Sequence, residues 1–359
     1  MSEFQYRVCF DYSGTNYDSV MSMTKKIGKQ TLKLQYPPTI AATAAVVGQK
    51  EGQGPLKRYF DYISDDSYFG EKTWEKAEST MLKQCFTLCC SKGKVSPEEL
   101  DFVFSGDLLN QCVGSAFAMK DTNVPYFGLY GACSTMGESL TLAAMTIDGG
   151  FAGTVCALTS SHFCSSERQY RFPLEYGGQR TPTAQWTVTG SGAAILKSNG
   201  NGPFITHVTP GKIVDAGIKD ANNMGSAMAP SAYETLKAHF EDTGRSPDYY
   251  DLIVTGDLGV LGHDTLEDLF RHDGMTLGKS YNDCGILIFD IQKQDVHAGG
   301  SGCGCSASVF ASYIMQGFTE NRWSKVLFAP TGALMSPTSS QQGDSIPGIC
   351  HAIAIEKTL

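Results

Sequence analysis

The sequence predicts an α/β protein that consists of two similar halves, with a mostly parallel sheet covered by helices. Strand-like and helix-like runs alternate from Gly28 onward with short turns between them, which is typical of β-α-β units. One segment also occurs twice, because residues 101–108 are DFVFSGDL and residues 251–258 are DLIVTGDL. Internal repetition at half the chain length indicates a duplicated architecture.

The first half contains helix and strand signals in alternation. Residues 71–92 are predicted to form a helix that Gly93 ends, because apolar side chains recur on one face. Those side chains belong to Trp74, Ala77, Met81, Cys85 and Leu88. Strands are expected at 101–105, at 124–130 as a buried strand, and at 154–161. A further helix is expected over 136–148, with Gly149-Gly150 as its stop.

The second half repeats this order. Residues 131–151 align without gaps on residues 298–318, so that Gly137 meets Gly304 and Ser139 meets Ser306. A strand-like run follows each copy, at 155–159 and 326–329. The turn-rich segment 197–203 lies between the halves. We therefore expect a peripheral extension at 1–27, a first half at 28–200 and a second half at 201–359.

Composition excludes several classes of protein. The 359 residues carry a net charge of −9, and no basic stripe offsets it, which argues against nucleic-acid binding. No apolar run is long enough to cross a bilayer, and residues 1–27 lack the apolar core of a signal peptide. The twelve cysteines lack the spacing of a disulfide framework or a zinc site, so we expect a reducing compartment and no structural metal.

Cys133 lies where a predicted strand turns into a predicted helix. Free backbone N–H groups and the positive end of the helix dipole lower the pKa of a thiol and can hold an anion. Cys133 therefore marks either a nucleophile or a ligand pocket. The alternative is a packing role, because unpaired cysteines are among the most frequently buried residues.

Several motifs together give the chain a specific resemblance. They occupy residues 52–57 followed by 60–62, 74–78, 131–135, 166–173 with 175–179, 299–305, 331–337 and 346–348. The sequence also has a duplicated unit and a cysteine at a helix start. Together with the motifs, these features resemble those of the stage V sporulation protein AD family of the thiolase-like superfamily. The resemblance extends from about Gly28 to the end of the sequence. The resemblance implies a five-layer αβαβα fold built from two similar halves, and a homodimer.

The resemblance also implies a function and a location. Members of this family are described as components of the machinery that loads dipicolinic acid, largely as its calcium chelate, into the developing spore. We accordingly expect a dipicolinate-binding protein in the forespore, peripheral to the spore inner membrane beside membrane-embedded stage V proteins. No cofactor is expected, although calcium can arrive with the ligand.

Condensing enzymes of the thiolase fold combine their cysteine with histidine or asparagine, which handle the proton. In related synthases one histidine follows the first strand of the second half, where this chain has Gly256-Asp257-Leu258. We therefore expect that thiolase-type catalysis is lost and the pocket is kept. The alternative is an acyl-thioester transferase or condensing enzyme that uses Cys133 as its nucleophile. A third interpretation is a scaffold that only docks to membrane partners.

Dipicolinate is a flat ring with two carboxylates, so its site needs cationic donors and an apolar slot. The residues expected to bind it are Cys133 at the pocket floor, Arg168 and Arg171 as donors, Tyr170, Phe172 and Tyr176 as ring contacts, and His297 and Ser301 from the second half. For the arginines, surface ion pairs with Glu167 or Glu175 are equally compatible with the sequence. For His297, a hydrogen-bonded turn is the favoured alternative. Four acidic residues near turns, Asp65, Asp66, Asp107 and Asp257, are interpreted as turn and capping groups.

Overall fold

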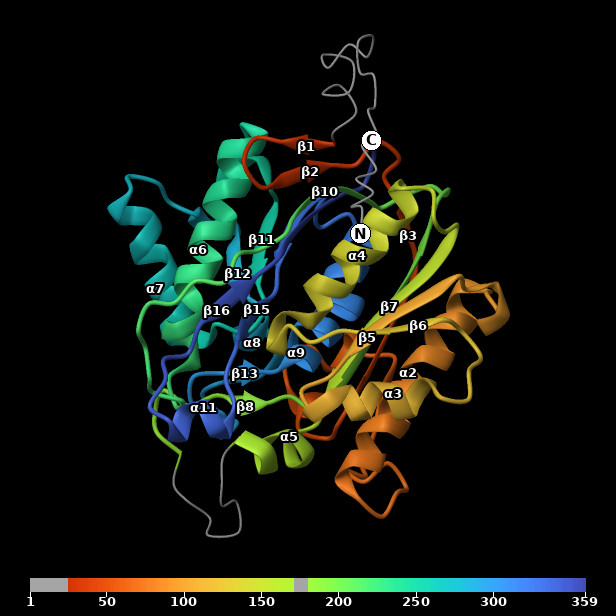
Figure 1. Cartoon of the computed structure of the whole chain (residues 1–359), viewed down its shortest axis with the longest axis horizontal. Coiled ribbons are helices and arrows are strands. Elements are labelled where there is room, and N and C mark those ends of the chain that lie inside the picture. The colour runs from red at the N-terminus through yellow and green to blue at the C-terminus, as the bar shows by residue number, and fades with distance from the viewer. Residues whose placement is uncertain (1–24, 171–179) are drawn as a thin grey trace, which may run out of the picture.

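One large mixed sheet runs through the molecule, with helices on both of its faces (Figure 1). The computed structural model describes residues 25–170 and 180–359. The ten strands along the main path of the sheet are β3 (Thr39–Val47), β5 (Phe102–Gly106), β6 (Tyr126–Gly128), β7 (Thr154–Ser161), β9 (Gly190–Lys197), β10 (Phe204–Thr209), β11 (Leu252–Thr255), β12 (Tyr281–Asp283), β14 (Lys325–Ala329) and β17 (Ala352–Glu356).

Shorter strands lie beside this path or in two small separate sheets. They are β1 (Lys26–Ile27), β2 (Thr31–Lys33), β4 (Tyr62–Ile63), β8 (Trp186–Thr187), β13 (Gly300–Ser301), β15 (Thr331–Ala333) and β16 (Gly348–Cys350). The helices are α2 (Trp74–Gly93), α3 (Val113–Met119), α4 (Thr135–Asp148), α5 (Phe163–Tyr170), α6 (Met224–Thr243), α7 (Gly259–His272), α8 (Cys284–Ile288), α9 (Cys303–Val309), α10 (Met315–Thr319) and α11 (Pro337–Gln341).

The strand order confirms that the two halves are similar. The first half has the order β3-β9-β7-β5-β6, and the second half has β10-β17-β14-β11-β12. In the order of each half, neighbours among the first three strands run antiparallel, and the last three strands run parallel to one another. The halves meet where β3 pairs with β10. Helices α2 and α3 lie near one end of the sheet, and α6 and α7 near the other (Figure 1).

The expectation of a mostly parallel sheet is wrong at the centre of the molecule. Strands β9 and β17 run antiparallel to both of their neighbours and were not among the strands predicted. Hydrophobic alternation locates strands, but it does not reveal their direction, which depends on how the chain returns to the sheet. The helices expected at 71–92 and 136–148 are confirmed as α2 and α4, and the strand at 154–161 is confirmed as β7.

The predicted buried strand at 124–130 is also corrected. Strand β6 covers only three residues, pairs only with β5 and leaves Phe127 and Gly128 exposed. It is an edge strand, so only one of its sides is hydrogen bonded to the sheet. The apolar character of this segment therefore reflects an exposed sheet edge instead of a core strand.

Matching details support the duplication at the level of side chains. Asp101 accepts hydrogen bonds from the backbone N–H groups of Gly153 and Thr154, at 2.7 and 3.0 Å. In the second half Asp251 accepts from Ser324 and Lys325 at the same two distances. Each aspartate thereby ties the start of one strand to the start of its parallel neighbour.

The glycine-rich start of α9 packs on the sheet. A Cβ atom on Gly304 would lie 2.2 Å from the carbonyl oxygen of Gly190 on β9 and 2.6 Å from the hydroxyl of Ser161 on β7. The contact is between the start of a helix and two strands. This close approach requires a residue without a side chain.

We predict that Gly304→Ala destabilises the protein by about 1–3 kcal/mol, because the added methyl group meets backbone atoms that cannot move aside. Thermal unfolding should show a melting temperature several degrees lower. Gly153→Ala is the matched control, since the nearest atom to its Cβ lies 3.8 Å away. Equal melting temperatures for the two variants would contradict the packing described for Gly304.

Candidate binding site around Cys133

Cys133 lies in a short 3-10 turn, residues Ala132–Ser134, that leads directly into α4. The residue is buried, with 6% of its surface exposed. Ala132 before it has a φ of 49°, a left-handed conformation that is uncommon for a residue with a side chain. The Cys133 sulfur lies 3.9 Å from the hydroxyl oxygen of Ser301. The structure thus brings together these two predicted residues from opposite halves.

Asp257 completes a buried polar cluster with Cys133 and Ser301. Its Oδ2 accepts hydrogen bonds from the Ser301 hydroxyl and from the Gly302 backbone, both at 3.0 Å. Its Oδ1 accepts from the Thr331 hydroxyl at 2.9 Å. Asp257 was interpreted as a turn or capping group, but that interpretation misses its place in this cluster, where it is fully buried just after β11. The Gly-Asp-Leu at the ends of both β5 and β11 was the signal that could have identified it.

The surroundings of Cys133 favour the protonated thiol. Burial raises the pKa of Cys133 well above its ordinary value, and electrostatic interactions with Asp257 and Cys303 raise it further. The helix start was expected to lower this pKa, but desolvation dominates because the residue is almost completely buried. Burial also raises the pKa of Asp257 to about 6. An activated thiolate nucleophile requires the opposite environment.

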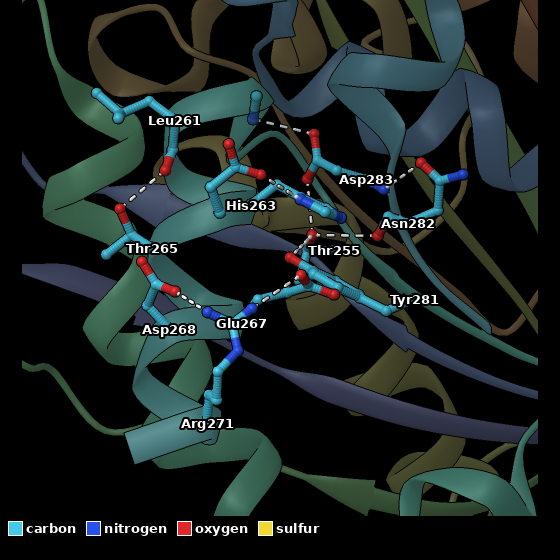
Figure 2. Close-up of polar contacts among 12 residues, drawn as sticks. Thr255, Leu261, His263, Thr265, Glu267, Asp268, Arg271, Tyr281, Asn282 and Asp283 are labelled. Atoms are coloured by element: carbon cyan, nitrogen blue, oxygen red, sulfur yellow. Dashed lines mark hydrogen bonds and ion pairs between the residues drawn. The ribbon is translucent and has the colours of Figure 1, made fainter. Parts of the chain in front are cut away.

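Asp283 holds the loop that carries Asp257. Its carboxylate accepts hydrogen bonds from the Thr255 hydroxyl at 2.7 Å and from the backbone N–H groups of Leu258 and Gly259 at 2.9 and 3.0 Å. It also accepts from Gly285 at 2.9 Å, at the start of α8. Figure 2 shows Asp283 pointing toward Thr255. The end of β11 is thereby fixed on both sides of Asp257.

His263 does not supply the base that the second half lacks. It lies on α7, with its ring stacked on Tyr281 at 4.3 Å between centroids, and its Nδ1 is 3.1 Å from Asp264 (Figure 2). All seven histidines lie in the described part of the chain. There, the hydrogen bonds of their rings join them to residues outside the Cys133 cluster.

Of the other predicted ligand residues, the structure describes the side chains of Arg168 and His297, and both contact residues outside the Cys133 cluster. Arg168 lies exposed on α5 and forms an ion pair with Glu75 of α2. A surface ion pair was the alternative considered for this arginine, although with Glu167 or Glu175 as its partner. His297 lies in a turn, where its ring contacts the Thr181 carbonyl oxygen at 2.6 Å and Asp295 at 3.0 Å. This is the hydrogen-bonded turn considered as the alternative. The side chain of Tyr170, and all of Arg171, Phe172 and Tyr176, lie outside the described residues.

A second pair of buried acids adjoins the cluster and was not anticipated. Glu78 of α2 accepts hydrogen bonds from the hydroxyls of Ser160 and Ser165, at 3.0 and 2.6 Å. Burial, followed by the nearby charge of Asp107, raises the pKa of Glu78 to about 8. Cys303 links this pair to the site, because its thiol donates to the Ser160 carbonyl oxygen at 2.9 Å. The polar cluster around Cys133 thus continues through Cys303 to Ser160 and Glu78.

We predict that Glu78→Gln flattens the pH dependence of stability. The folded protein keeps the Glu78 proton up to about pH 8, whereas the unfolded chain releases it near pH 4.5, so stability falls as the pH rises between these values. One such proton contributes a slope of up to about 1.4 kcal/mol per pH unit. Urea unfolding at several pH values measures this slope. Glu98→Gln, at an exposed position, should leave it unchanged; an unchanged slope in Glu78→Gln would contradict the prediction.

The described residues include no group of three or more histidine, cysteine or acidic side chains arranged to hold a metal ion. Within the same residues, no helix is long and apolar enough to cross a membrane. The cluster around Cys133 instead offers hydroxyls, a thiol and backbone N–H groups at a helix start. Such groups can donate hydrogen bonds to a carboxylate.

The fold and the cysteine at a helix start define a protein of the thiolase-like class. Solved structures with the same fold include 3-oxoacyl-[acyl-carrier-protein] synthase III of Aquifex aeolicus, with a TM-score of 0.53, 13% identity and coverage of 89% of this chain and 99% of that one. Human mitochondrial 3-ketoacyl-CoA thiolase gives a TM-score of 0.55 with 12% identity, covering 90% and 99%. OleA of Xanthomonas campestris gives 0.56 with 12% identity, covering 90% and 99%.

Within this class the chain belongs to the stage V sporulation protein AD (SpoVAD) family. The family model matches residues 28–356. Stage V sporulation protein AD of Bacillus subtilis (strain 168) is 41% identical over 333 residues, which cover 93% of this chain and 98% of that protein. The family assignment made from the sequence motifs is confirmed.

Proposed function

We propose that this sporulation protein binds dipicolinate, free or as its calcium chelate, at the Cys133 cluster, and that it catalyses no reaction on it. One observation supports this most strongly. At the helix start where thiolase-like enzymes place a reactive cysteine, the thiol of Cys133 faces the carboxyl group of Asp257, and burial holds its pKa well above the ordinary value. The position keeps hydrogen-bonding groups for a ligand, and among the described residues no histidine ring is hydrogen bonded to the Cys133 thiol.

The charge of Asp257 bears on the form of the ligand. Ionised Asp257 repels a dianion, and burial raises its pKa to about 6. Protonation of Asp257 removes the repulsion, so affinity for free dipicolinate should rise as the pH falls toward about 6. The calcium chelate carries no net charge, and its affinity should change little over the same range. Titrations at several pH values therefore distinguish the two forms.

Calorimetric titration with dipicolinate, with and without calcium, tests the proposal directly. Wild type should bind saturably, and Cys133→Ala and Arg171→Ala should bind more weakly while their melting temperatures stay close to that of wild type. The absence of heat at millimolar ligand would contradict dipicolinate binding. Hydrolysis or transfer of a labelled acyl-coenzyme A by wild type, lost in Cys133→Ala, would instead establish the enzyme alternative.

The proposal includes assembly and location. We expect the protein to lie in the forespore, at the inner membrane beside membrane-embedded stage V proteins, and to form a homodimer through the edge strand β6. Phe127 on this strand is 49% exposed and Phe117 on the neighbouring α3 is 59% exposed, so this edge carries uncovered apolar surface. Light scattering should give a dimer for wild type and a monomer for Phe127→Lys. A monomeric wild type would contradict the dimer.

A further inference from the structure

Two cationic side chains lie over the ring of Trp186, at the start of β8. The ammonium group of Lys50 lies 3.7 Å from the centre of the Trp186 ring, and the guanidinium carbon of Arg180 lies 4.8 Å from it. Phe163 of α5 stacks on the same ring, at 3.8 Å between centroids. The indole thus forms a rigid base on which both cations rest.

Among the described residues, Asp295 is the acidic residue that contacts both cations. Its backbone carbonyl oxygen accepts from Lys50 at 3.1 Å and from Arg180 at 2.8 Å, and its carboxylate lies 2.9 Å from Arg180. The same carboxylate also contacts His297. Glu51 adjoins Lys50 in sequence, but burial raises its pKa to about 7, which disfavours its charged form. The contacts of the described residues thus place one ionised carboxylate beside two cations.

Two observations show that these cations are not fully satisfied. The Nη1 atom of Arg180 is buried and has no hydrogen-bond partner among the described residues. Burial and the charge of Arg180 both lower the pKa of Lys50, so the two cations repel each other. An anion between them would remove the repulsion and accept the free guanidinium N–H.

This cationic pair also lies near the Cys133 cluster. Strand β8 pairs in parallel with β13, so that Trp186 stands beside Gly300 and Thr187 beside Ser301. Ser301 in turn contacts Cys133 and Asp257. We propose that Lys50 and Arg180, supported by Trp186, form an anion-binding site for a carboxylate or phosphate group. The identity of the ligand rests on the proposed function, which makes dipicolinate the candidate. Lys50 and Arg180 then provide the cationic contacts that were expected of Arg168.

The test compares Lys50→Gln and Arg180→Gln with wild type and with Arg168→Gln, the matched control on the exposed surface of α5. Binding of dipicolinate, picolinate and inorganic phosphate is measured by calorimetry. Modification of Lys50 by an amine-reactive reagent, followed by mass spectrometry, reports independently whether an anion covers Lys50. Each cation removed should weaken binding roughly tenfold or more, the usual contribution of a charged hydrogen bond. Arg168→Gln should bind as wild type does.

The outcomes separate this site from the proposed function. Dipicolinate binding that is equal in all four proteins would overturn the anion site and leave the proposed function standing. A second outcome combines two results: dipicolinate does not bind, and phosphate protects Lys50 from the amine-reactive reagent in wild type but not in Arg180→Gln. This outcome would support the anion site and overturn the proposed function. If no anion binds and none protects Lys50, both proposals fail. Picolinate binding as tightly as dipicolinate would show that one carboxylate suffices.

Discussion

Asp283→Ala is expected to lower the free energy of unfolding by about 4 kcal/mol or more, because it leaves several buried donors without an acceptor. The backbone N–H groups of Leu258, Gly259 and Gly285 and the hydroxyl of Thr255 all donate to this one carboxylate. Backbone donors in a buried loop cannot turn toward water. Replacement by asparagine keeps one acceptor oxygen and should recover part of the loss.

Chemical denaturation of both variants measures this effect, and Asp264→Ala provides the control. Asp264 lies on α7, but its side chain is 66% exposed, so its removal should change stability by less than about 0.5 kcal/mol. A loss in Asp283→Ala as small as that of Asp264→Ala would show that the loop around Asp257 does not depend on Asp283. Its position would then need another explanation.

Cys133 is expected to react with iodoacetamide at about pH 8 roughly a hundredfold more slowly in the folded protein than in the unfolded chain. Only the thiolate reacts, and burial together with Asp257 raises the pKa of this thiol well above the usual range. Asp257→Asn removes the adjacent negative charge and should increase the rate. Mass spectrometry of the Cys133 peptide measures it.

Cys112 is an internal control for this reaction, since it is only half-buried and should be modified before Cys133. Modification of Cys133 in the folded protein as fast as in the unfolded chain would identify an activated nucleophile. That result would favour acyl transfer over ligand binding. A rate in Asp257→Asn equal to that of wild type would assign the raised pKa to burial alone.

The sequence located half of the Cys133 cluster. Cys133 and Ser301 were identified because each lies at the start of a helix in a repeated unit, and helix starts can be recognised from local spacing. Asp257 and Thr331 were missed, since a side chain after a strand looks the same in sequence whether it faces solvent or a buried neighbour. Lys50 and Arg180 were missed for a similar reason, as they are 130 positions apart and meet only in the folded chain, at Trp186 and Asp295.

The sequence by itself determined the duplicated α/β architecture, the family and the positions of α2, α4 and β7, because each depends on patterns within one segment or on a direct repeat. Tertiary structure alone decided the antiparallel direction of β9 and β17 and the edge position of β6. It also decided the protonation of Cys133. The helix start predicted a lowered pKa, but the thiol is buried beside Asp257, and desolvation depends on residues that only the folded chain brings together.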